Sequence, residues 1–430
     1  MHRITRGFAV ATGVALLATG CGGGDSTSSS SSSAPASASA SPSEPGATAR
    51  SDADLVVWTD DEHAEATRAV AEGFGEDNGI SVAVQAVPNG ELQTNFVTAN
   101  TAGNGPDVVL GAHDWIGNMV QNGAIDPLQL TPDQVSAYDP IAVQATTYGG
   151  QLYGLPYGLE SLVLYRNTDV VPDAPANLDD AIAAGEAAVA AGQVESAFNL
   201  QQGALGDAYH MQPLFTSAGG VVFGQDANGD ADPTQLGLDQ PGSIAAAQKI
   251  AELGEGGRNI LRRSISADNS TALFTDGRAA FLISGPWARP DLDTAGLNYA
   301  VSPVPSFTGG QPAQPFTGVQ AFYVASKGEN KAFAQEFLAS TVNTEEAQET
   351  MLEGTGLAPA MTSVQERIAA ADPLAQAFIT AAKSGTPMPS IPAMAAVWEP
   401  LGQAYASIIA GEDPTTTMQG AAQTINAAID

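Results

Sequence analysis

Two tryptophans in this chain stand where apolar segments end, a placement that suits a ring for ligand binding. Trp287 closes the segment Ser284-Gly-Pro-Trp287, directly after the apolar run 279–283. A buried strand that breaks at a Gly-Pro step places the next ring at a sheet edge, where open α/β folds bind ligands. Trp398 closes a similar segment, residues 388–398. A core position is the commoner place for such a ring, but two rings placed in this way together predict a sugar-binding cleft.

Sugar chemistry defines which other residue types belong in such a cleft. A neutral oligosaccharide offers flat patches of C–H bonds and a rim of hydroxyl groups that donate and accept hydrogen bonds. Aromatic faces match the patches, whereas carboxylates, amides and Tyr hydroxyls match the rim. We therefore expect rings mixed with acids, and no metal ion or other cofactor.

Alternating strands and helices are predicted to carry these residues. Residues 55–58 form an apolar run typical of a buried strand, and Val70 and Phe74 share one face of the helix that follows. Further strands are expected around residues 80–84 and 107–110, which together predict a mainly parallel sheet with ligands at its carboxyl edge. The segment Ala112-His113-Asp114 falls at that edge.

From about residue 55 to residue 430 the chain resembles the maltose-binding proteins and their relatives, the extracellular solute-binding lipoproteins of sugar ABC transporters (solute-binding protein family 1). The resemblance rests on short segments that occur in the family's order. They are Leu55-Val-Val-Trp58, Gly105-Pro-Asp107-Val-Val, Ala112-His-Asp114, Glu160-Ser-Leu-Val-Leu-Tyr-Arg-Asn167, Phe198-Asn-Leu-Gln201, Ser284-Gly-Pro-Trp287, and Pro389-Ser-Ile-Pro392 through Trp398.

The resemblance implies an α/β fold of two lobes, each a mainly parallel sheet flanked by helices. The lobes are expected to be joined by a hinge that the chain crosses after residue 158, near 317–321 and near 367–374. Lobe I would then comprise residues 53–158 plus 320–367, and lobe II residues 162–316 plus 374–430. Sugar would bind between the lobes and stabilise their closed arrangement.

The resemblance also implies a set of ligand-binding residues: Asp114 and Glu160 as acceptors, Trp287 and Trp398 as ring platforms, and Tyr209, Glu62 and His63 as further contacts. Capping or hinge roles remain open for Asp114 and Glu160. Asp60 or Asp61 could serve in place of Glu62 and His63, and this acidic run also fits a solvated surface. Four positions depart from the family pattern: Gly111 replaces a tryptophan, Trp115 an arginine, Glu399 a tyrosine and Gly402 an arginine. We include Trp115 in the candidate site because it lies one helical turn from the lost ring. Glu399 is included as well.

The N-terminus has the pattern of an export signal. Basic residues at 2, 3 and 6 precede the apolar stretch 8–18, which is too short to span a bilayer. The only cysteine, Cys21, ends a segment that resembles a lipobox. We expect a signal peptide over residues 1–20, a lipidated Cys21, and a disordered Ser/Pro/Ala-rich tether over residues 21–52. An ordinary signal peptide with an incidental cysteine is the alternative.

Charge restricts the partners. The chain has 15 basic and 47 acidic residues and a formal net charge of −32. Phosphate backbones and anionic lipid surfaces repel such a protein, so nucleic acid is excluded and the membrane is expected only through the lipid anchor. The expected protein is a monomer outside the cytoplasm, whose partners are a neutral oligosaccharide and the permease subunits of an ABC transporter.

Other functions fit the sequence less well. Asp114 and Glu160 could be the carboxylate pair of a glycoside hydrolase, but the resemblance favours a binding protein and no enzyme. A Ser/His/Asp hydrolase is disfavoured because there is no Gly-x-Ser-x-Gly motif, and His113 fits a structural role better. The acidic turn 226–232 lacks the spacing of a calcium loop. Among receptors, maltodextrin is the expected cargo, with trehalose, cyclodextrin or another sugar as alternatives.

Overall fold

The computed structural model describes residues 49–226 and 231–429. The chain divides into the units Met1–Pro45 and Gly46–Asp430. The predicted signal peptide, Cys21, most of the predicted tether and the centre of the turn 226–232 lie outside the described residues. Within the described ranges, no helix has the length and apolar character that crossing a membrane requires.

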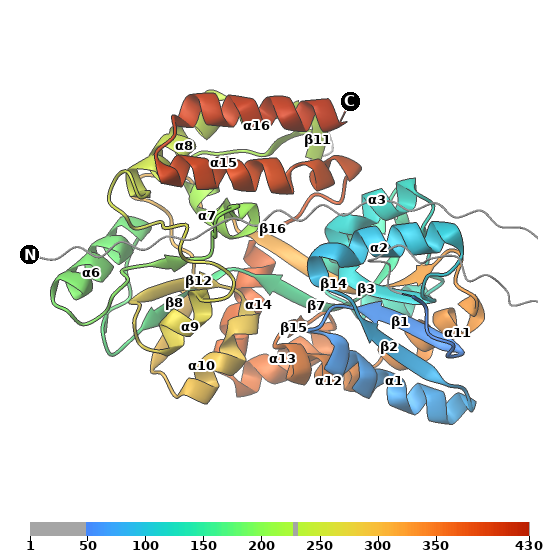
Figure 1. Ribbon diagram of the computed structural model, residues 1–430. Coiled ribbons are helices and arrows are strands. Elements are labelled where there is room, and N and C mark those ends of the chain that lie inside the picture. Colours follow the sequence, from blue (N-terminus) through green and yellow to red (C-terminus); the bar gives the residue numbers. More distant parts are fainter. Residues whose placement is uncertain (1–48, 227–230, 430) are drawn as a thin grey trace, which may run out of the picture. The chain divides into compact units, whose positions relative to one another are not determined.

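The larger sheet of the second unit has eight strands, ordered β15-β7-β14-β3-β1-β2, with β4 and β16 also paired to β14 (Figure 1). Its strands are β1 (Leu55–Thr59), β2 (Val82–Ala86), β3 (Val108–Ala112), β4 (Ile125–Asp126), β7 (Gly154–Ser161), β14 (Phe316–Ala325), β15 (Ala358–Pro359) and β16 (Thr386–Pro387). We call this sheet and its helices lobe I. The predicted strands at 55–58, 80–84 and 107–110 are confirmed in position by β1, β2 and β3.

The helical elements along lobe I are α1 (Ala64–Asn78), α2 (Asn89–Ala102), η1 (His113–Trp115), α3 (Ile116–Gln121), α4 (Pro132–Ser136), α5 (Pro140–Ala145), α11 (Lys331–Glu336), η3 (Phe337–Val342), α12 (Glu345–Thr355) and α13 (Thr362–Ala371). α1 ends because Gly79 adopts a left-handed conformation, φ 63°, that glycine accommodates without steric cost. The hairpin of β5 (Thr147–Tyr148) and β6 (Gln151–Leu152) turns through two glycines with positive φ, as the Gly-Gly pair predicts.

The smaller sheet has the order β13-β8-β12-β9 and is the centre of what we call lobe II. Its strands are β8 (Val163–Asn167), β9 (Asn199–Leu200), β12 (Phe281–Ser284) and β13 (Tyr299–Pro303), and β10 (Phe223–Gln225) pairs with β11 (Ala231–Leu236) as a separate hairpin. The helical elements are α6 (Leu178–Ala190), α7 (Ala208–Ser217), α8 (Pro241–Leu253), α9 (Ser270–Thr275), η2 (Pro286–Ala288), α10 (Arg289–Ala295), η4 (Pro392–Ala396), α15 (Trp398–Ala410) and α16 (Pro414–Ile429).

The two-lobed α/β architecture agrees with the prediction, but the sheets are mixed instead of mainly parallel. In lobe I, β1 pairs in parallel with β2 and β3, whereas β14 pairs antiparallel with both β3 and β7. In lobe II, β8 is antiparallel to both of its neighbours, and only β9 runs parallel to β12. In lobe I, β7 leads out toward the hinge whereas β14 comes back in from it, so the two strands run in opposite directions.

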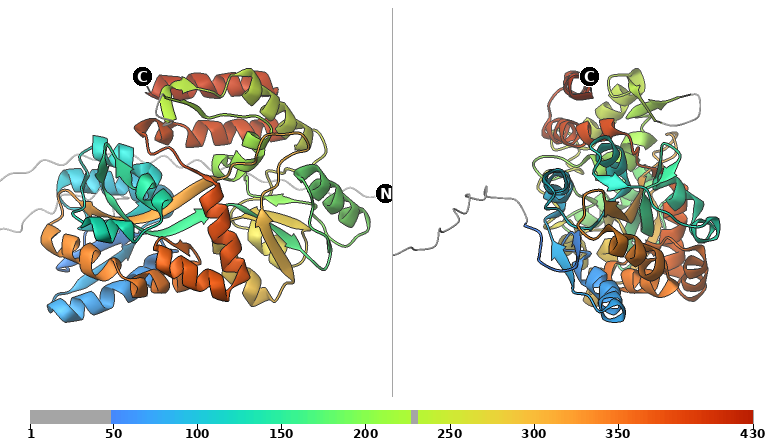
Figure 2. Two further views of the ribbon diagram at one scale, coloured as in Figure 1. Left: turned by 180° about the vertical axis from the view of Figure 1, so that it is seen from behind. Right: turned by 90° about the vertical axis from the view of Figure 1, so that its right-hand side faces the viewer.

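Three segments pass between the hydrophobic cores of the lobes. Leu159 belongs to the core of lobe I and Leu162 to that of lobe II, and Phe316 and Val319 divide in the same way. The third passage is expected near 367–374. Helix α14 (Pro373–Ser384) packs against both lobes: Ile379 joins the core of lobe I, and Phe378 packs with Tyr165 of β8 in lobe II. Figure 2 shows α14 beside the strands of the hinge. The lobe boundaries themselves stay a prediction.

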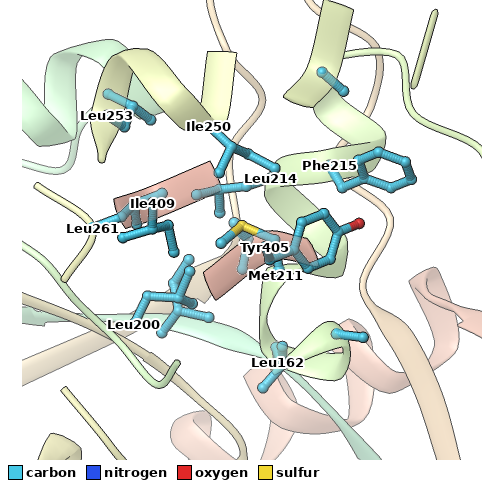
Figure 3. Close-up of a cluster of buried hydrophobic side chains, with 14 of the residues drawn as sticks. Leu162, Leu200, Met211, Leu214, Phe215, Ile250, Leu253, Leu261, Tyr405 and Ile409 are labelled. Carbon is cyan, nitrogen blue, oxygen red and sulfur yellow. The ribbon is translucent and has the colours of Figure 1, made fainter. Parts of the chain in front are cut away.

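The core of lobe II fixes the helices that carry its site residues. Side chains of α7, α8 and α15 meet above the smaller sheet, where Met211, Leu214, Ile250, Tyr405 and Ile409 are each at most 1% exposed (Figure 3). Burial of such side chains contributes about 1.5–3 kcal/mol each. The first turn of α7 and the start of α15 are thereby held next to the hinge.

Residues 49–52, assigned from sequence to the tether, are instead docked on lobe I. The side chain of Arg50 is only 7% exposed, and its Nη1 lies 2.8 Å from Oδ2 of Asp107, which is fully buried. Ser51 donates its backbone N–H to Oε1 of Gln85, whose Nε2 donates to the carbonyl of Ala49. This end of the predicted tether therefore belongs to lobe I, because Arg50 has a buried partner there.

Candidate functional site

The carboxyl ends of strands in lobe I present one half of the candidate site. β1 leads into Asp60 and His63, β3 into His113 and Asp114, and β7 carries Glu160 close to the hinge. This is the sheet edge at which α/β folds bind ligands.

His63 is held by Asp60. Its Nδ1 lies 2.6 Å from Oδ1 of Asp60, which also accepts the backbone N–H of His63. The imidazole packs edge-on against the ring of Tyr157, with 6.0 Å between centroids. Burial alone would lower the pKa of His63, but the hydrogen bond and charge of Asp60, together with the charge of Glu160, raise it above its ordinary value. The neighbouring acids thus favour the protonated form of His63.

Glu160 is a half-buried carboxyl with one side-chain donor. Burial raises the pKa of Glu160 to about 6, although the charge of His63 and a 3.3 Å bond from Nε2 of Gln320 act in the opposite direction. The carboxyl lies over Gly318, where a Cβ would be only 2.6 Å from Oε1. Glycine at 318 therefore makes the space that Glu160 occupies.

Asp114 and Trp398 are hydrogen-bonded to each other. The indole Nε1 of Trp398, at the start of α15, donates to Oδ2 of Asp114 at 3.2 Å. Burial raises the pKa of Asp114 to about 6, and the bond from Trp398 offsets part of that rise. An acceptor expected in lobe I and a ring expected in lobe II are thus joined directly.

Rings from lobe II and the hinge gather around this bond. The centroid of Phe316 lies 5.8 Å from that of Trp398 and 6.4 Å from that of Tyr209. Tyr209 in turn lies 6.3 Å from Trp287. Trp287 packs against the cores of both lobes, so it sits at their junction. Trp287, Trp398, Tyr209, Asp114 and Glu160, all expected from sequence, are therefore brought to one region.

Trp287 and Trp115 each lie over a glycine that leaves room for the indole. A Cβ on Gly285 would be 2.0 Å from Cζ3 of Trp287, and one on Gly111 would be 2.1 Å from Cζ3 of Trp115. Gly111, where the resembled family has a tryptophan, is thus covered by the indole of Trp115. Trp115 packs against the core that surrounds Trp58.

Two expected site residues remain at the surface. Glu62 is exposed, although its charge is felt by His63 and Glu160. Glu399 is exposed on α15 and accepts a hydrogen bond from Gln403 one turn later. The packing also explains glycine at position 402, where the resembled family has an arginine, because a Cβ there would approach the backbone of Gly206 to 3.3 Å.

Several buried hydroxyls near the carboxyls have unused hydrogen-bonding capacity. The hydroxyls of Tyr157, Tyr209 and Tyr323 and Oγ1 of Thr59 have no partner among the described residues. Burial raises the pKa of Tyr209 well above its ordinary value, and the charges of Glu160, Asp207 and Asp114 add to that rise. Leaving such a group unpaired costs about 1–3 kcal/mol, so the site favours water molecules or a ligand that is rich in hydroxyl groups.

His113 has the structural role that the sequence favoured. The backbone N–H of Val319 donates to its Nδ1, so the proton is on Nε2, which donates to the carbonyl of Met388 at 3.0 Å. Burial lowers the pKa of His113 to about 4, which keeps the ring neutral. With both nitrogens bonded to backbone, His113 ties two hinge passages together and is not available as a general base.

Sequence reasoning missed Phe316, Gln320 and Tyr157 as neighbours of the candidate residues. Phe316 and Gln320 lie on β14 and Tyr157 on β7, within the predicted hinge passages, but no motif marks their side chains. Within the described ranges, no group of three or more His, Cys, Asp or Glu side chains could hold a metal ion.

Comparison with known proteins decides the family. Residues 69–377, more than half of the chain, match the family described as bacterial extracellular solute-binding proteins. The chain belongs to this family. It is a family of binding proteins and not of enzymes, and its members act outside the cytoplasm.

Individual relatives of this solute-binding protein are named for sugars. It is 27% identical over 402 residues to a galactooligosaccharide-binding protein of Bacillus subtilis, covering 89% of this chain and 91% of that one. It is 27% identical over 377 residues to a maltooligosaccharide ABC transporter solute-binding lipoprotein of Streptococcus pneumoniae, covering 86% and 88%. Its fold matches a Thermus thermophilus maltotriose-binding protein bound with maltotriose, at a TM-score of 0.79 and 29% identity, over 87% of this chain and 100% of that one.

Proposed function

We propose that this protein captures neutral oligosaccharides of the maltodextrin type between its lobes and delivers them to the permease of an ABC transporter. The observation that carries the proposal is the direct bond between Asp114 and Trp398, surrounded by the rings of Phe316, Tyr209 and Trp287. Stacking faces and hydroxyl acceptors lie side by side there, as a sugar requires.

Asp114, Glu160, Trp287, Trp398 and Tyr209 are the residues to which we assign ligand contact. Glu62, His63, Trp115 and Glu399 complete the proposed set, and the exposure of Glu62 and Glu399 suits contacts at the rim. Lipid attachment at Cys21 would hold the protein on the outer face of the cell membrane. The receptor would be a monomer without enzymatic activity. The pneumococcal relative, named as a lipoprotein of an ABC transporter, supports this arrangement.

Titration calorimetry of the purified protein with maltotriose tests the proposal. We expect stoichiometric heat and a micromolar dissociation constant, about −8 kcal/mol, because a receptor must also release its cargo. Trp287→Ala should abolish that heat while leaving the far-UV circular dichroism unchanged. Release of reducing ends during incubation with maltodextrins would instead favour a glycoside hydrolase that uses Asp114 and Glu160.

Galactooligosaccharides are the second candidate cargo, because the relative named for them matches this chain over 91% of its own length. A thermal-shift panel of maltotriose, galactooligosaccharides, trehalose and cyclodextrin separates the sugars. A response only to galactooligosaccharides would overturn the maltodextrin assignment and keep the receptor.

A further inference from the structure

His210 and Asp207 form a fixed pair at the start of α7. Oδ1 of Asp207 caps the helix by accepting the backbone N–H of His210 at 2.9 Å, and Oδ2 lies 2.8 Å from Nδ1 of His210. Oδ2 also accepts from Nε2 of Gln201 at 2.7 Å. Burial would raise the pKa of Asp207, but the charge and hydrogen bonds of His210 and the bond from Gln201 lower it below its ordinary value.

An ionised Asp207 requires a proton on Nδ1 of His210. A carboxylate only accepts hydrogen bonds, so Nδ1 of His210 must carry the proton that it donates. Nε2 is then the ring nitrogen left to pair with a ligand, and a sugar hydroxyl suits it because a hydroxyl both donates and accepts. Within the part of the chain that the structure describes, Nε2 of His210 makes no hydrogen bond, although the residue is only 6% exposed.

The ring of His210 packs against the rings of both Tyr209 and Trp287. It stands edge-on to Tyr209, at 5.5 Å and 75°, and edge-on to Trp287, at 6.1 Å and 81°. A sugar that stacks on Trp287 would therefore carry its hydroxyl rim past the imidazole. The acceptors Asp114 and Glu160 are also close, since their charges act on Tyr209.

Lobe I repeats the arrangement with Asp60 and His63. The acid again precedes the histidine by three residues, accepts its backbone N–H and contacts its Nδ1, at 2.6 Å. His63 likewise packs edge-on against a tyrosine, Tyr157. Each lobe thus brings to the site a histidine whose Nδ1 is occupied by an aspartate.

We infer that His210 contacts the ligand and helps to set its specificity, with Nε2 hydrogen-bonded to a hydroxyl of the sugar that stacks on Trp287. The inference rests on the proposed function. Asp207 is the positioning residue, because it holds Nδ1 and so fixes the direction in which Nε2 points.

His210→Phe tests the contact by calorimetry with maltotriose. Phenylalanine keeps a ring against Tyr209 and Trp287 but removes the hydrogen-bonding nitrogen, so we expect a dissociation constant about tenfold larger than that of the wild type. His210→Gln, which restores an acceptor without the ring, should bind more tightly than His210→Phe. Equal affinities of the wild type and His210→Phe would overturn the inference.

Asp207→Asn tests the positioning role. Asparagine caps a helix as well as aspartate does, so the fold should persist, while its amide can donate to Nδ1 and so favour the other tautomer. We expect weaker binding of maltotriose and, in ¹⁵N–¹H spectra, loss of the proton from Nδ1 of His210. The matched control is Asp413→Asn at the exposed start of α16, where Asp413 accepts the N–H of Thr416, and its affinity should not change.

The wild-type protein gives an independent readout that needs no variant. Titration with maltotriose should shift the ¹⁵N resonance of Nε2 of His210 while Nδ1 stays protonated. A wild-type ring without a proton on Nδ1, or an Nε2 resonance unmoved by bound maltotriose, would overturn the inference alone. Absence of wild-type binding to both maltotriose and galactooligosaccharides would instead overturn the proposed function.

Discussion

The indole Nε1 of Trp398 donates a hydrogen bond to Oδ2 of Asp114 across 284 residues of chain, at 3.2 Å. This contact links the end of β3 in lobe I to the start of α15 beside lobe II. The bond therefore fixes the orientation of both the ring platform and the hydroxyl acceptor before a sugar arrives.

Trp398→Phe should weaken sugar binding about tenfold or more, because hydrogen bonds to charged groups contribute about 1.5–3 kcal/mol. The substitution keeps a ring beside Phe316 and removes only the indole N–H. Calorimetry with maltotriose at pH 7 measures the change. Trp58→Phe is the matched control, since it removes a similar bond, from Nε1 to Gln85, outside the site. An equal loss in both variants would contradict the role of the Asp114 contact.

Asp114→Asn should stabilise the fold above pH 7 by about 1–3 kcal/mol, because the raised pKa of Asp114 makes its ionised form unfavourable in the native state. The native carboxyl, with a pKa of about 6, holds its proton between pH 4 and 6 when the unfolded one does not. Rising pH therefore lowers wild-type stability in that window, and the variant lacks this slope.

Urea unfolding of both proteins from pH 4 to 8 measures the difference. The neutral His113 has the opposite pH dependence, because its depressed pKa makes the native state more stable as pH rises through the window. It is present in both proteins and cancels in the comparison. A difference in unfolding free energy that is the same at every pH would contradict the raised pKa.

Gly285→Ala should displace Trp287 and weaken sugar binding, because the new Cβ would lie 2.0 Å from the indole. Tryptophan fluorescence should change along with the affinity, which calorimetry measures. Gly420→Ala, in α16, is the control: nothing lies within 4 Å of its Cβ, and alanine should stabilise the helix by about 0.5–1 kcal/mol. Unaltered affinity in Gly285→Ala would remove the need for the present pose of Trp287.

Arg50→Gln should lower the free energy of unfolding by about 1–3 kcal/mol, because Asp107 stays buried and loses its charged partner. Trypsin should cut the native protein slowly after Arg50, since residues 49–52 are docked on lobe I. Arg367→Gln, which breaks an exposed pair with Glu345, should cost less than about 1 kcal/mol. Equal losses in the two variants would contradict the docking of Arg50.

The sequence alone predicted the β1–α1–β2 opening and the two lobes, and it supplied the main candidate residues, whose ligand contacts remain predictions. Buried strands are apolar runs, helices end at residues such as Gly79, and the segments around Asp114, Glu160 and Trp287 are recognisable as short motifs, so these features are local along the chain. The signal peptide, the lipidation of Cys21 and the permease remain predictions, and the family supports them.

Tertiary structure alone decided the direction of strand pairing and the partners of the site residues. β7 and β14 pair antiparallel because of how they enter the hinge, which no local pattern encodes. Asp114 meets Trp398, and Arg50 meets Asp107, only after distant segments pack together. Hydrogen bonds and burial depend on three-dimensional neighbours, whereas sequence patterns report mainly which face of an element is apolar.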